Sequence, residues 1–197
     1  MTVDFETLLR EVGALREGHF LLSSGRHSDR YIEKFDLLAD PRATATICEQ
    51  IAGQFADAGV AVVAGPTTGG ILLAFEVARQ LGVRAAYAER ATSGPGREFR
   101  RGAIPQSGER VLVVDDILTT GGSVRETLAA LADHQADPVA IAVLVDRSGG
   151  RVDFGVPLAP VLRTDITTYD PADCPLCRAG VPLVKPGTTA NPGERRV

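Results

Sequence analysis

The 197-residue chain is predicted to fold as an α/β domain with a central, mostly parallel sheet flanked by helices. Segments of strand length that are apolar on both faces alternate along the chain with segments of helical periodicity, a pattern typical of a parallel sheet covered on both sides. Two glycine-rich turns follow directly on two of these strands. Ligands of such sheets bind at the carboxyl ends of the strands, so both turns mark a candidate site.

The first 38 residues differ from this alternating pattern. Apolar side chains at spacings of three and four predict a short amphipathic helix over residues 5–15, which Gly18 ends. Residues 19–38 carry no sustained helical stripe, and we interpret them as short strands around a Ser-Ser-Gly turn.

The alternating part of the chain begins at Asp40-Pro41, a capping acid followed by a proline at the first helical position. The helix that starts there is expected to end by Gly59. Further helices are predicted over residues 71–81 and near 124–133, and strands over residues 60–64, 83–88, 111–114, 138–145 and, at an edge, 157–163. No internal repeat or second domain is evident, and the tail from Lys185 onward, rich in Pro, Gly and polar residues, is expected to be mobile.

Composition excludes several classes of protein. The net charge of -4 argues against general nucleic-acid binding, which needs a basic surface. No apolar run approaches the roughly 20 residues of a membrane span, and the N-terminus has no basic segment typical of a secretion signal. Three cysteines do not make a disulfide framework, so a reducing, cytoplasmic location is expected.

The strongest motif is RVLVVDDILTTGGS, residues 110–123. A buried strand ends in Asp115 and Asp116, and a turn with two glycines then opens a helix. Free backbone N–H groups at a helix start form a cradle for an anion, and glycine lets the backbone approach it closely. An alternative is that Ser123 merely caps the helix, with Glu126 completing a capping box. Capping does not explain the two acids and two glycines, so a phosphate site is favoured.

The segment VLVVDDILTTGGS is similar to the thirteen-residue signature of the type I phosphoribosyltransferases. The resemblance implies a Rossmann-like fold, with a core over about 40–165 and a small hood formed by about 1–38 and the C-terminal segment. It implies that the turn holds the 5-phosphate of phosphoribosyl pyrophosphate and that the acid pair holds the ribose hydroxyls. The donor-site residues carried over are Asp115, Asp116, Ile117, Leu118, Thr119, Thr120, Gly121, Gly122 and Ser123.

The second glycine-rich turn is GPTTGG, residues 65–70. Taken alone it also fits a purely structural turn. The family places its pyrophosphate-binding loop at this position, and the residues that carry over are Thr67, Thr68 and Gly69.

Residues 18–32, GHFLLSSGRHSDRYI, resemble the N-terminal segment of the orotate phosphoribosyltransferases. That resemblance implies that Tyr31 and Ile32 line the base pocket, that Arg147 meets the orotate and that Thr119 lies near the base. The guanidinium fork of arginine suits a carboxylate, which orotate carries. The alternative for Arg147 is a solvated charge at the end of a strand.

Residues 88–102, AERATSGPGREFRRG, depart from the family's mobile catalytic loop, which carries lysines and a histidine. Arg90 matches the loop arginine, but no lysine or histidine follows it, and Ser23 and Gly69 stand where further lysines are expected. The missing charge could come from Arg97, Arg100, Arg101 or Arg26. A lysine-poor sequence with a Cys-Pro-Leu-Cys stretch resembles a Thermus-type branch of the family. A flexible connector is the alternative for residues 93–101.

Cys174 and Cys177 form a single CxxC motif, too few ligands for a zinc site. His19, His27 and His134 show no ligand spacing. A structural role is therefore favoured over zinc shared across a dimer, and Cys48 is assigned to the core.

Taken together, the resemblance implies transfer of ribose 5-phosphate from phosphoribosyl pyrophosphate to orotate, in the synthesis of UMP. Asp115, Asp116 and Arg90 are the predicted catalytic residues, and Mg²⁺ is expected to bind through substrate oxygens, with no protein side chain as a metal ligand. The implied assembly is a cytoplasmic homodimer whose subunits share active sites, with no nucleic-acid or membrane partner. The alternatives are transfer to another base, such as a purine, and a non-catalytic nucleotide-sensing regulator.

Overall fold

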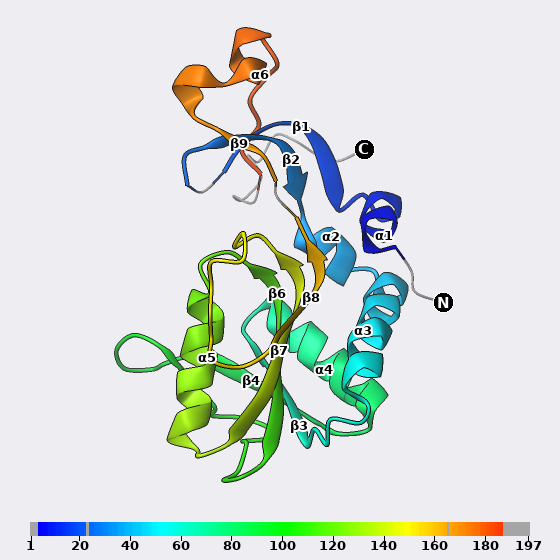
Figure 1. The fold of residues 1–197 in the computed structure, drawn as a ribbon, viewed down its shortest axis with the longest axis vertical. Coiled ribbons are helices and arrows are strands. Elements are labelled where there is room, and N and C mark those ends of the chain that lie inside the picture. The colour runs from blue at the N-terminus through cyan, green and yellow to red at the C-terminus, as the bar shows by residue number, and fades with distance from the viewer. Residues whose placement is uncertain (1–3, 23, 165, 187–197) are drawn as a thin grey trace.

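The computed structural model describes residues 4–22, 24–164 and 166–186, which form a large α/β core and a smaller hood on one end of it (Figure 1). The predicted mobile tail, 185–197, lies almost entirely outside the described residues. None of the helices in the described ranges combines the length and the apolar character that a membrane crossing requires.

The core is a six-stranded sheet with the strand order β5-β4-β3-β6-β7-β8, parallel throughout except for β5. The strands are β3 (Val62–Pro66), β4 (Arg84–Arg90), β5 (Arg97–Glu98), β6 (Arg110–Leu118), β7 (Asp137–Asp146) and β8 (Leu158–Arg163). The predicted parallel sheet is confirmed, with β8 at its edge as expected. The ladder of β6 with β7 continues to the pair Leu118–Asp146, so β6 is longer than the predicted 111–114 and contains the acid pair.

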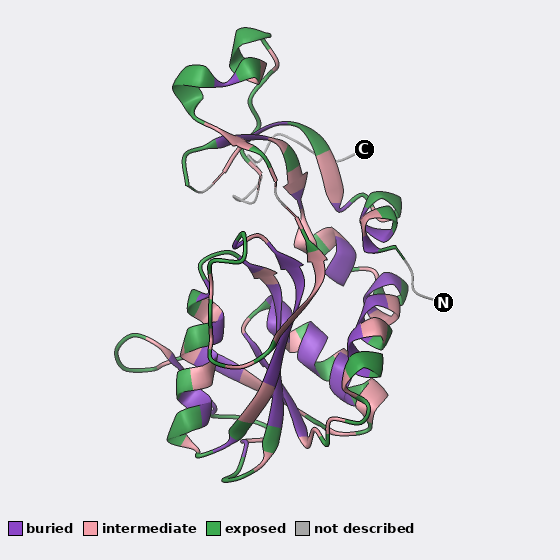
Figure 2. Ribbon diagram, in the orientation of Figure 1, coloured by how far each residue is buried: buried purple, intermediate pink, exposed green. Residues whose placement is uncertain are grey.

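Helices cover both faces of this sheet. Helices α3 (Pro41–Phe55) and α4 (Gly69–Leu81) pack on one face, and α5 (Gly122–Asp133) packs on the other (Figure 1). The carboxylate of Asp40 accepts hydrogen bonds from the first backbone N–H groups of α3, as its capping position predicts. Figure 2 shows the central strands buried between these layers, which explains why they are apolar on both faces.

The hood is a three-stranded antiparallel sheet with the order β1-β2-β9, formed by β1 (Leu15–Leu21), β2 (His27–Ile32) and β9 (Thr168–Tyr169). Below it lie two short helices, α1 (Phe5–Glu11) and α2 (Lys34–Leu38). The prediction of one helix over 5–15 was therefore too long, because the chain turns at Gly13 with φ of 70° and Leu15 begins a strand. Residues 34–38 are helical rather than extended, since Glu33 caps a turn that buries Leu37 and Leu38.

The C-terminal segment returns to the hood. A 3₁₀ turn, η1 (Pro171–Asp173), and the short helix α6 (Pro175–Arg178) follow β9. The chain then passes beside β1, where Val184 exchanges backbone hydrogen bonds with His19 and Leu21. The two ends of the described chain therefore build the hood together (Figure 1).

Candidate active site at the carboxyl ends of the strands

The turn after β6 has the geometry of an anion cradle. Gly121 has φ of 79° and begins α5, with no side chain capping the exposed N–H groups of the first turn. A Cβ atom at this glycine would also lie 2.8 Å from the ring of Phe154. The sequence needs glycine here for both reasons, and the uncapped helix start leaves its backbone donors available for an anion.

The capping-box alternative for this turn is wrong. Ser123 lies inside α5, and its hydroxyl donates to Oδ2 of Asp115 at 2.6 Å instead of accepting from the helix backbone. Glu126 turns away from the helix start and forms ion pairs of 3.2 Å with Arg90 and Arg97. Ser123 and Glu126 therefore bind charged side chains around the turn and do not cap the helix.

The two acids differ in their surroundings. Burial and, to a lesser extent, the neighbouring charge of Asp116 raise the pKa of Asp115 to about 6, against the opposing effect of the Ser123 hydroxyl. Asp116 is also buried, but its Oδ2 forms an ion pair of 2.7 Å with Nζ of Lys34. Lys34 comes from α2, below the hood, and sequence reasoning missed it because no motif connects it with the acid pair.

The turn after β3 lies against the turn after β6, because β3 and β6 are neighbouring parallel strands. A Cβ atom at Gly69 would lie 1.9 Å from Oδ2 of Asp116, so the second turn needs a glycine to approach the acid pair. Thr67 and Thr68, joined by a cis peptide bond, precede it. The structure thus brings the predicted residues Thr67, Thr68 and Gly69 to the same end of the sheet as 115–123.

Among the arginines considered for the missing lysines, Arg97 is the one that contacts the second turn. It is 8% exposed, and its Nη1 donates at 3.0 Å to the hydroxyl of Thr67 and to the carbonyl of Ala88. Burial lowers the pKa of this guanidinium. Arg90, the predicted loop arginine, is exposed at the end of β4 and contacts Glu126.

The other three candidate arginines lie elsewhere. Arg100 and Arg101 form ion pairs with Glu89, and Arg26 donates two hydrogen bonds to Thr168 in the hood. Residues 88–102 are therefore more than a solvated connector, because β5 pairs with β4 and Arg97 is held inside. Without the expected lysines, the sequence did not show which arginine contacts the second turn. Among the candidate arginines, Arg97 is distinguished by its burial.

A cavity of about 450 Å³ lies where β7, β8 and the hood meet, lined by Arg147, Arg151, Thr164, Ile166, Thr167 and Thr168. Arg147 follows β7, and its backbone N–H donates to the carbonyl of Leu118 at 2.8 Å, which ties it to the end of β6. Burial lowers the pKa of Arg147, which is not a solvated strand-end charge. Burial also raises the pKa of Tyr31, and the nearby guanidinium of Arg147 partly opposes this.

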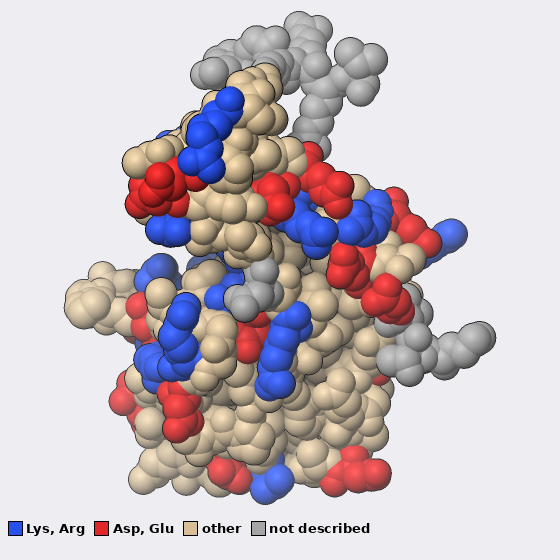
Figure 3. Space-filling model, turned by 45° about the horizontal axis from the view of Figure 1, so that its top comes forward, with Lys and Arg blue, Asp and Glu red and all other residues tan. Residues whose placement is uncertain are grey.

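The remaining base-pocket residues divide into two groups. Ile32 is 5% exposed and packs into the core cluster beneath the hood, whereas Thr119 is exposed on the turn after β6, beside the donor-site residue Thr120. Figure 3 shows several Lys and Arg side chains along the boundary between hood and core, with acidic side chains between them. The basic side chains in this mixed surface can pair with a polyanionic ligand despite the negative net charge of the chain.

The oxygen donors at the two turns also bear on Mg²⁺. They are hydroxyl and carboxylate oxygens, the hard ligands that this ion prefers. Because Lys34 holds Asp116 and Ser123 holds Asp115, the two carboxylates do not form a cage. The residues fit an ion that is bound mainly through the oxygens of a substrate.

Comparisons with known proteins agree with this geometry. The profile of the phosphoribosyl transferase domain matches residues 36–154. Orotate phosphoribosyltransferases from Caldicellulosiruptor bescii and Thermotoga maritima are 46% and 44% identical over 181 residues, which cover 92% of this chain and 94% and 96% of those proteins.

Solved structures lead to the same family. Orotate phosphoribosyltransferase from Aeropyrum pernix superposes with a TM-score of 0.68 at 32% identity, over 81% of this chain and 93% of that one. Adenine phosphoribosyltransferase from Saccharomyces cerevisiae, at 19% identity, shares the fold with a TM-score of 0.62 over 80% of this chain and 99% of its own. A cradle after β6, a second glycine turn and 46% identity over most of the chain lead to one conclusion: the chain belongs to the phosphoribosyl transferase family, among the orotate phosphoribosyltransferases.

Proposed function

We propose that this chain transfers ribose 5-phosphate from phosphoribosyl pyrophosphate to orotate, giving orotidine 5′-phosphate and pyrophosphate. The observation that carries the acceptor assignment is the half-buried Arg147 beside Tyr31, at a cavity next to the β6 turn. A guanidinium withdrawn from water selects for an anion of matching shape, and the carboxylate of orotate provides one. The relatives named as orotate phosphoribosyltransferases support the same acceptor.

The donor's 5-phosphate is assigned to the turn after β6. In this proposal the backbone N–H groups of residues 118–122, together with the hydroxyls of Thr119 and Thr120, bind its oxygens. The N–H of Ile117 and the hydroxyl of Ser123 instead donate to the carboxylates of Asp116 and Asp115. Asp115 and Asp116 accept hydrogen bonds from the two ribose hydroxyls. Support comes from their position, since both carboxylates lie within the last residues of β6, directly before the turn.

The leaving pyrophosphate is assigned to the turn after β3, with contacts from Thr67, Thr68 and the backbone of Gly69. Arg97 lies behind this turn with its guanidinium on Thr67, so it contributes positive charge where the negative charge of the leaving group develops. Arg90 is proposed to reach the same group when substrate competes with Glu126 for it. Bound Mg²⁺ would add charge neutralisation on the pyrophosphate oxygens.

In the reaction the bond from the anomeric carbon to pyrophosphate breaks, and the nitrogen of orotate forms the new bond to that carbon. Arg147 orients the orotate carboxylate, while Tyr31, Ile32 and Thr119 border the base. The protein's main contributions are to hold the two reactants in line and to stabilise charge on the leaving group, because no side chain has to form a covalent intermediate.

A homodimer is also part of the proposal. Large apolar side chains are exposed on α2 and α4, where Phe35 is 47%, Leu72 45% and Phe75 64% exposed. Exposed aromatic side chains grouped on neighbouring helices are typical of protein interfaces. Sedimentation of the wild type and of Phe75→Glu tests this, with a dimer expected for the first and a shift to monomer for the second.

The deciding experiment follows orotate depletion by ultraviolet absorbance with phosphoribosyl pyrophosphate and Mg²⁺, with pyrophosphate release measured in parallel. Adenine, hypoxanthine and uracil serve as competing acceptors. Turnover of orotate alone supports the proposal. Turnover of another base would reassign the acceptor, and donor binding without pyrophosphate release would indicate a nucleotide-sensing regulator.

A further inference from the structure

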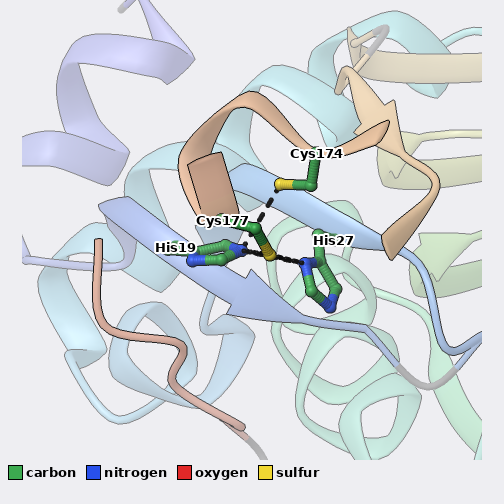
Figure 4. Close-up of side chains that lie close together, drawn as sticks. All are labelled: His19, His27, Cys174 and Cys177. Atoms are coloured by element: carbon green, nitrogen blue, oxygen red, sulfur yellow. Dashed lines mark hydrogen bonds between the residues drawn. The ribbon is translucent and has the colours of Figure 1, made fainter. Parts of the chain in front are cut away.

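Four metal-binding side chains converge in the hood, away from the phosphate turns. His19 lies on β1, His27 on β2, and Cys174 and Cys177 lie at α6, about 150 residues later in the chain. One ligand atom from each side chain lies within 4.8 Å of all the others. Figure 4 shows the four side chains pointing toward one another between the hood strands and the C-terminal segment.

The distances between these atoms fit a tetrahedral zinc site. Zn–S bonds of about 2.3 Å and Zn–N bonds of about 2.0–2.1 Å place tetrahedral ligand pairs about 3.3–3.8 Å apart. Nε2 of His19 lies 3.5 Å from Sγ of Cys174 and 3.8 Å from Sγ of Cys177, which in turn lies 3.3 Å from Nδ1 of His27. The two histidine nitrogens lie 2.9 Å apart and need to separate by only about 0.4 Å to reach this range.

Neighbouring groups already orient the first histidine for metal binding. Nδ1 of His19 lies 2.8 Å from the carbonyl oxygen of Val181. A carbonyl can only accept, so this nitrogen carries the proton, and in the neutral ring Nε2 presents its lone pair to the cluster. A metal-bound histidine usually donates its other ring N–H in this way, because the bond fixes both the tautomer and the ring orientation.

The donor set selects the metal. Two imidazoles and two thiols suit zinc, whereas Mg²⁺ and Ca²⁺ prefer oxygen ligands. His19, His27 and Cys174 are each at most 5% exposed, and Cys177 closes the exposed side. Four protein ligands leave no open position for water, which is typical of a structural site and not of a catalytic one.

The small size of the hood favours stabilisation by a metal ion. Its sheet contains only three strands, and β9 has two residues. Small units of this kind bury too little apolar surface to hold their parts together, and metals often supply the difference. Here the ligands come from β1, β2 and the segment around α6, so one ion would join the two chain ends that build the hood.

We propose that this protein binds one structural zinc ion through Nε2 of His19, Nδ1 of His27 and the thiolates of Cys174 and Cys177. Binding releases the two thiol protons to solvent and leaves the oxidation states unchanged. The ion fastens the C-terminal segment to the hood strands. The histidines belong to the same subunit as the CxxC motif, so the zinc site needs no second subunit. The sequence spacing of His19 and His27 gives no sign of this cluster, because the fold brings them to the CxxC motif.

The first test is the metal content of the full-length chain, produced without a histidine tag in zinc-containing medium. Elemental analysis is expected to find about one zinc per chain. Replacement with Co²⁺ is expected to give the visible bands of a tetrahedral ion and a thiolate-to-cobalt charge-transfer band. A zinc content below about a tenth of the chain concentration, with no cobalt spectrum, would overturn the proposal.

Variants then identify the ligands. Cys177→Ser and His27→Asn are expected to lower zinc affinity at least tenfold, as measured by competition with a chromogenic chelator. Cys177 is exposed, so its replacement leaves the core intact. Cys48→Ala and His134→Asn are the matched controls, because these residues lie outside the cluster, and they are expected to keep the full zinc content.

The main rival is a redox CxxC pair, which also sits at a helix start in other proteins. Thiol titration of the chain as purified, denatured without oxygen in the presence of a chelator, separates the two. A metal site predicts three titratable thiols after denaturation, counting Cys48, whereas a disulfide predicts one. These readouts do not depend on turnover, so a failed zinc site and a failed transferase assay are separate results.

Discussion

Side-chain hydrogen bonds in the phosphate end of the core and in the hood can join residues at very different sequence separations. In the core, Ser123 and Asp115 are 8 residues apart and Arg97 and Thr67 are 30 apart. In the hood, Ser28 donates to the carbonyl of Thr167 across 139 residues. Closing a long loop costs more conformational entropy, so such hood contacts are the more costly ones to form.

Burial follows the same division. Figure 2 shows the central core strands β3 and β6 almost fully buried, whereas the strands β1 and β2 of the hood mix buried, half-buried and exposed residues. Regions with few buried apolar contacts open more easily than the rest of a protein. We therefore expect the donor side of the site to be the more rigid side, and the acceptor side to adjust when ligand binds.

The largest effect is expected at Arg97, on the rigid side. Arg97→Gln removes the buried charge behind Thr67, and we expect kcat/KM to fall by about 10²–10³-fold, the usual cost of losing one donor to a developing charge. Arg101→Gln is the matched control, since Arg101 is exposed and pairs with Glu89. Equal losses in the two variants would show that general positive charge, and not the buried position, supports catalysis.

The next effect tests the acceptor side. Arg147→Ala removes the guanidinium from the cavity beside the hood, and the KM for orotate is expected to rise about 30–100-fold, as for loss of a charged hydrogen bond. The KM for phosphoribosyl pyrophosphate should change less than about threefold. Steady-state kinetics with each substrate varied separately measures both, and Arg42→Ala, on the exposed start of α3, is the control. A comparable rise for both substrates would contradict the division of the site.

On the donor side, replacing Asp115 is expected to change activity and stability in opposite directions. Its pKa is about 6 in the folded chain and near 3.8 when unfolded, so between these pH values only the folded chain holds the proton. The unfolding free energy therefore falls as pH rises through this window, and the penalty is complete above about pH 6. Two units correspond to about 2–3 kcal/mol.

Asp115→Asn is accordingly expected to be more stable than the wild type at pH 8 by about 2 kcal/mol, with no gain at pH 4. The same variant should lose about 10–100-fold in kcat/KM, because a charged acceptor for ribose is gone. In the wild type, kcat/KM for the donor should fall below about pH 6. Denaturant unfolding at pH 4 and pH 8 measures the stability of both chains, and steady-state kinetics measures kcat/KM. If Asp115→Asn is less stable than the wild type at pH 8, burial of the Asp115 charge does not destabilise the fold as proposed.

The smallest effect is expected in the hood itself. Ser28→Ala removes the hydrogen bond to the Thr167 carbonyl, at a cost of about 1 kcal/mol and a rise of about two- to fivefold in the KM for orotate. Hydrogen exchange should show faster exchange in β1 and β2 than in β3 and β6. Thr127→Ala is the control, since this buried threonine bonds within α5 of the core. Equal exchange rates in the hood strands and the core strands would contradict the proposed difference in local stability.

Much of the core could be predicted from the sequence because its signals are local. The Asp40-Pro41 helix start, the glycine that ends α4 and the strand-turn-helix at 110–123 each depend on neighbouring residues. The positions of the two glycine turns followed from the parallel sheet, which brings the carboxyl ends of its strands to one edge. The prediction for the core was wrong mainly in strand length, as for β6, whereas the wrong element types lie at the hood, where pairing between strands overrides local pattern.

What the sequence determined by itself was the parallel sheet, the two glycine turns and the family, since these are fixed by periodicity and by contiguous motifs. Only the tertiary structure decided that Lys34 pairs with Asp116, that Arg97 is the buried arginine, and that His19 and His27 meet the CxxC motif. These contacts join residues that are 82 or more positions apart or depend on burial. No local pattern encodes such proximity, because it arises when strands far apart in the chain pair and bring their side chains together.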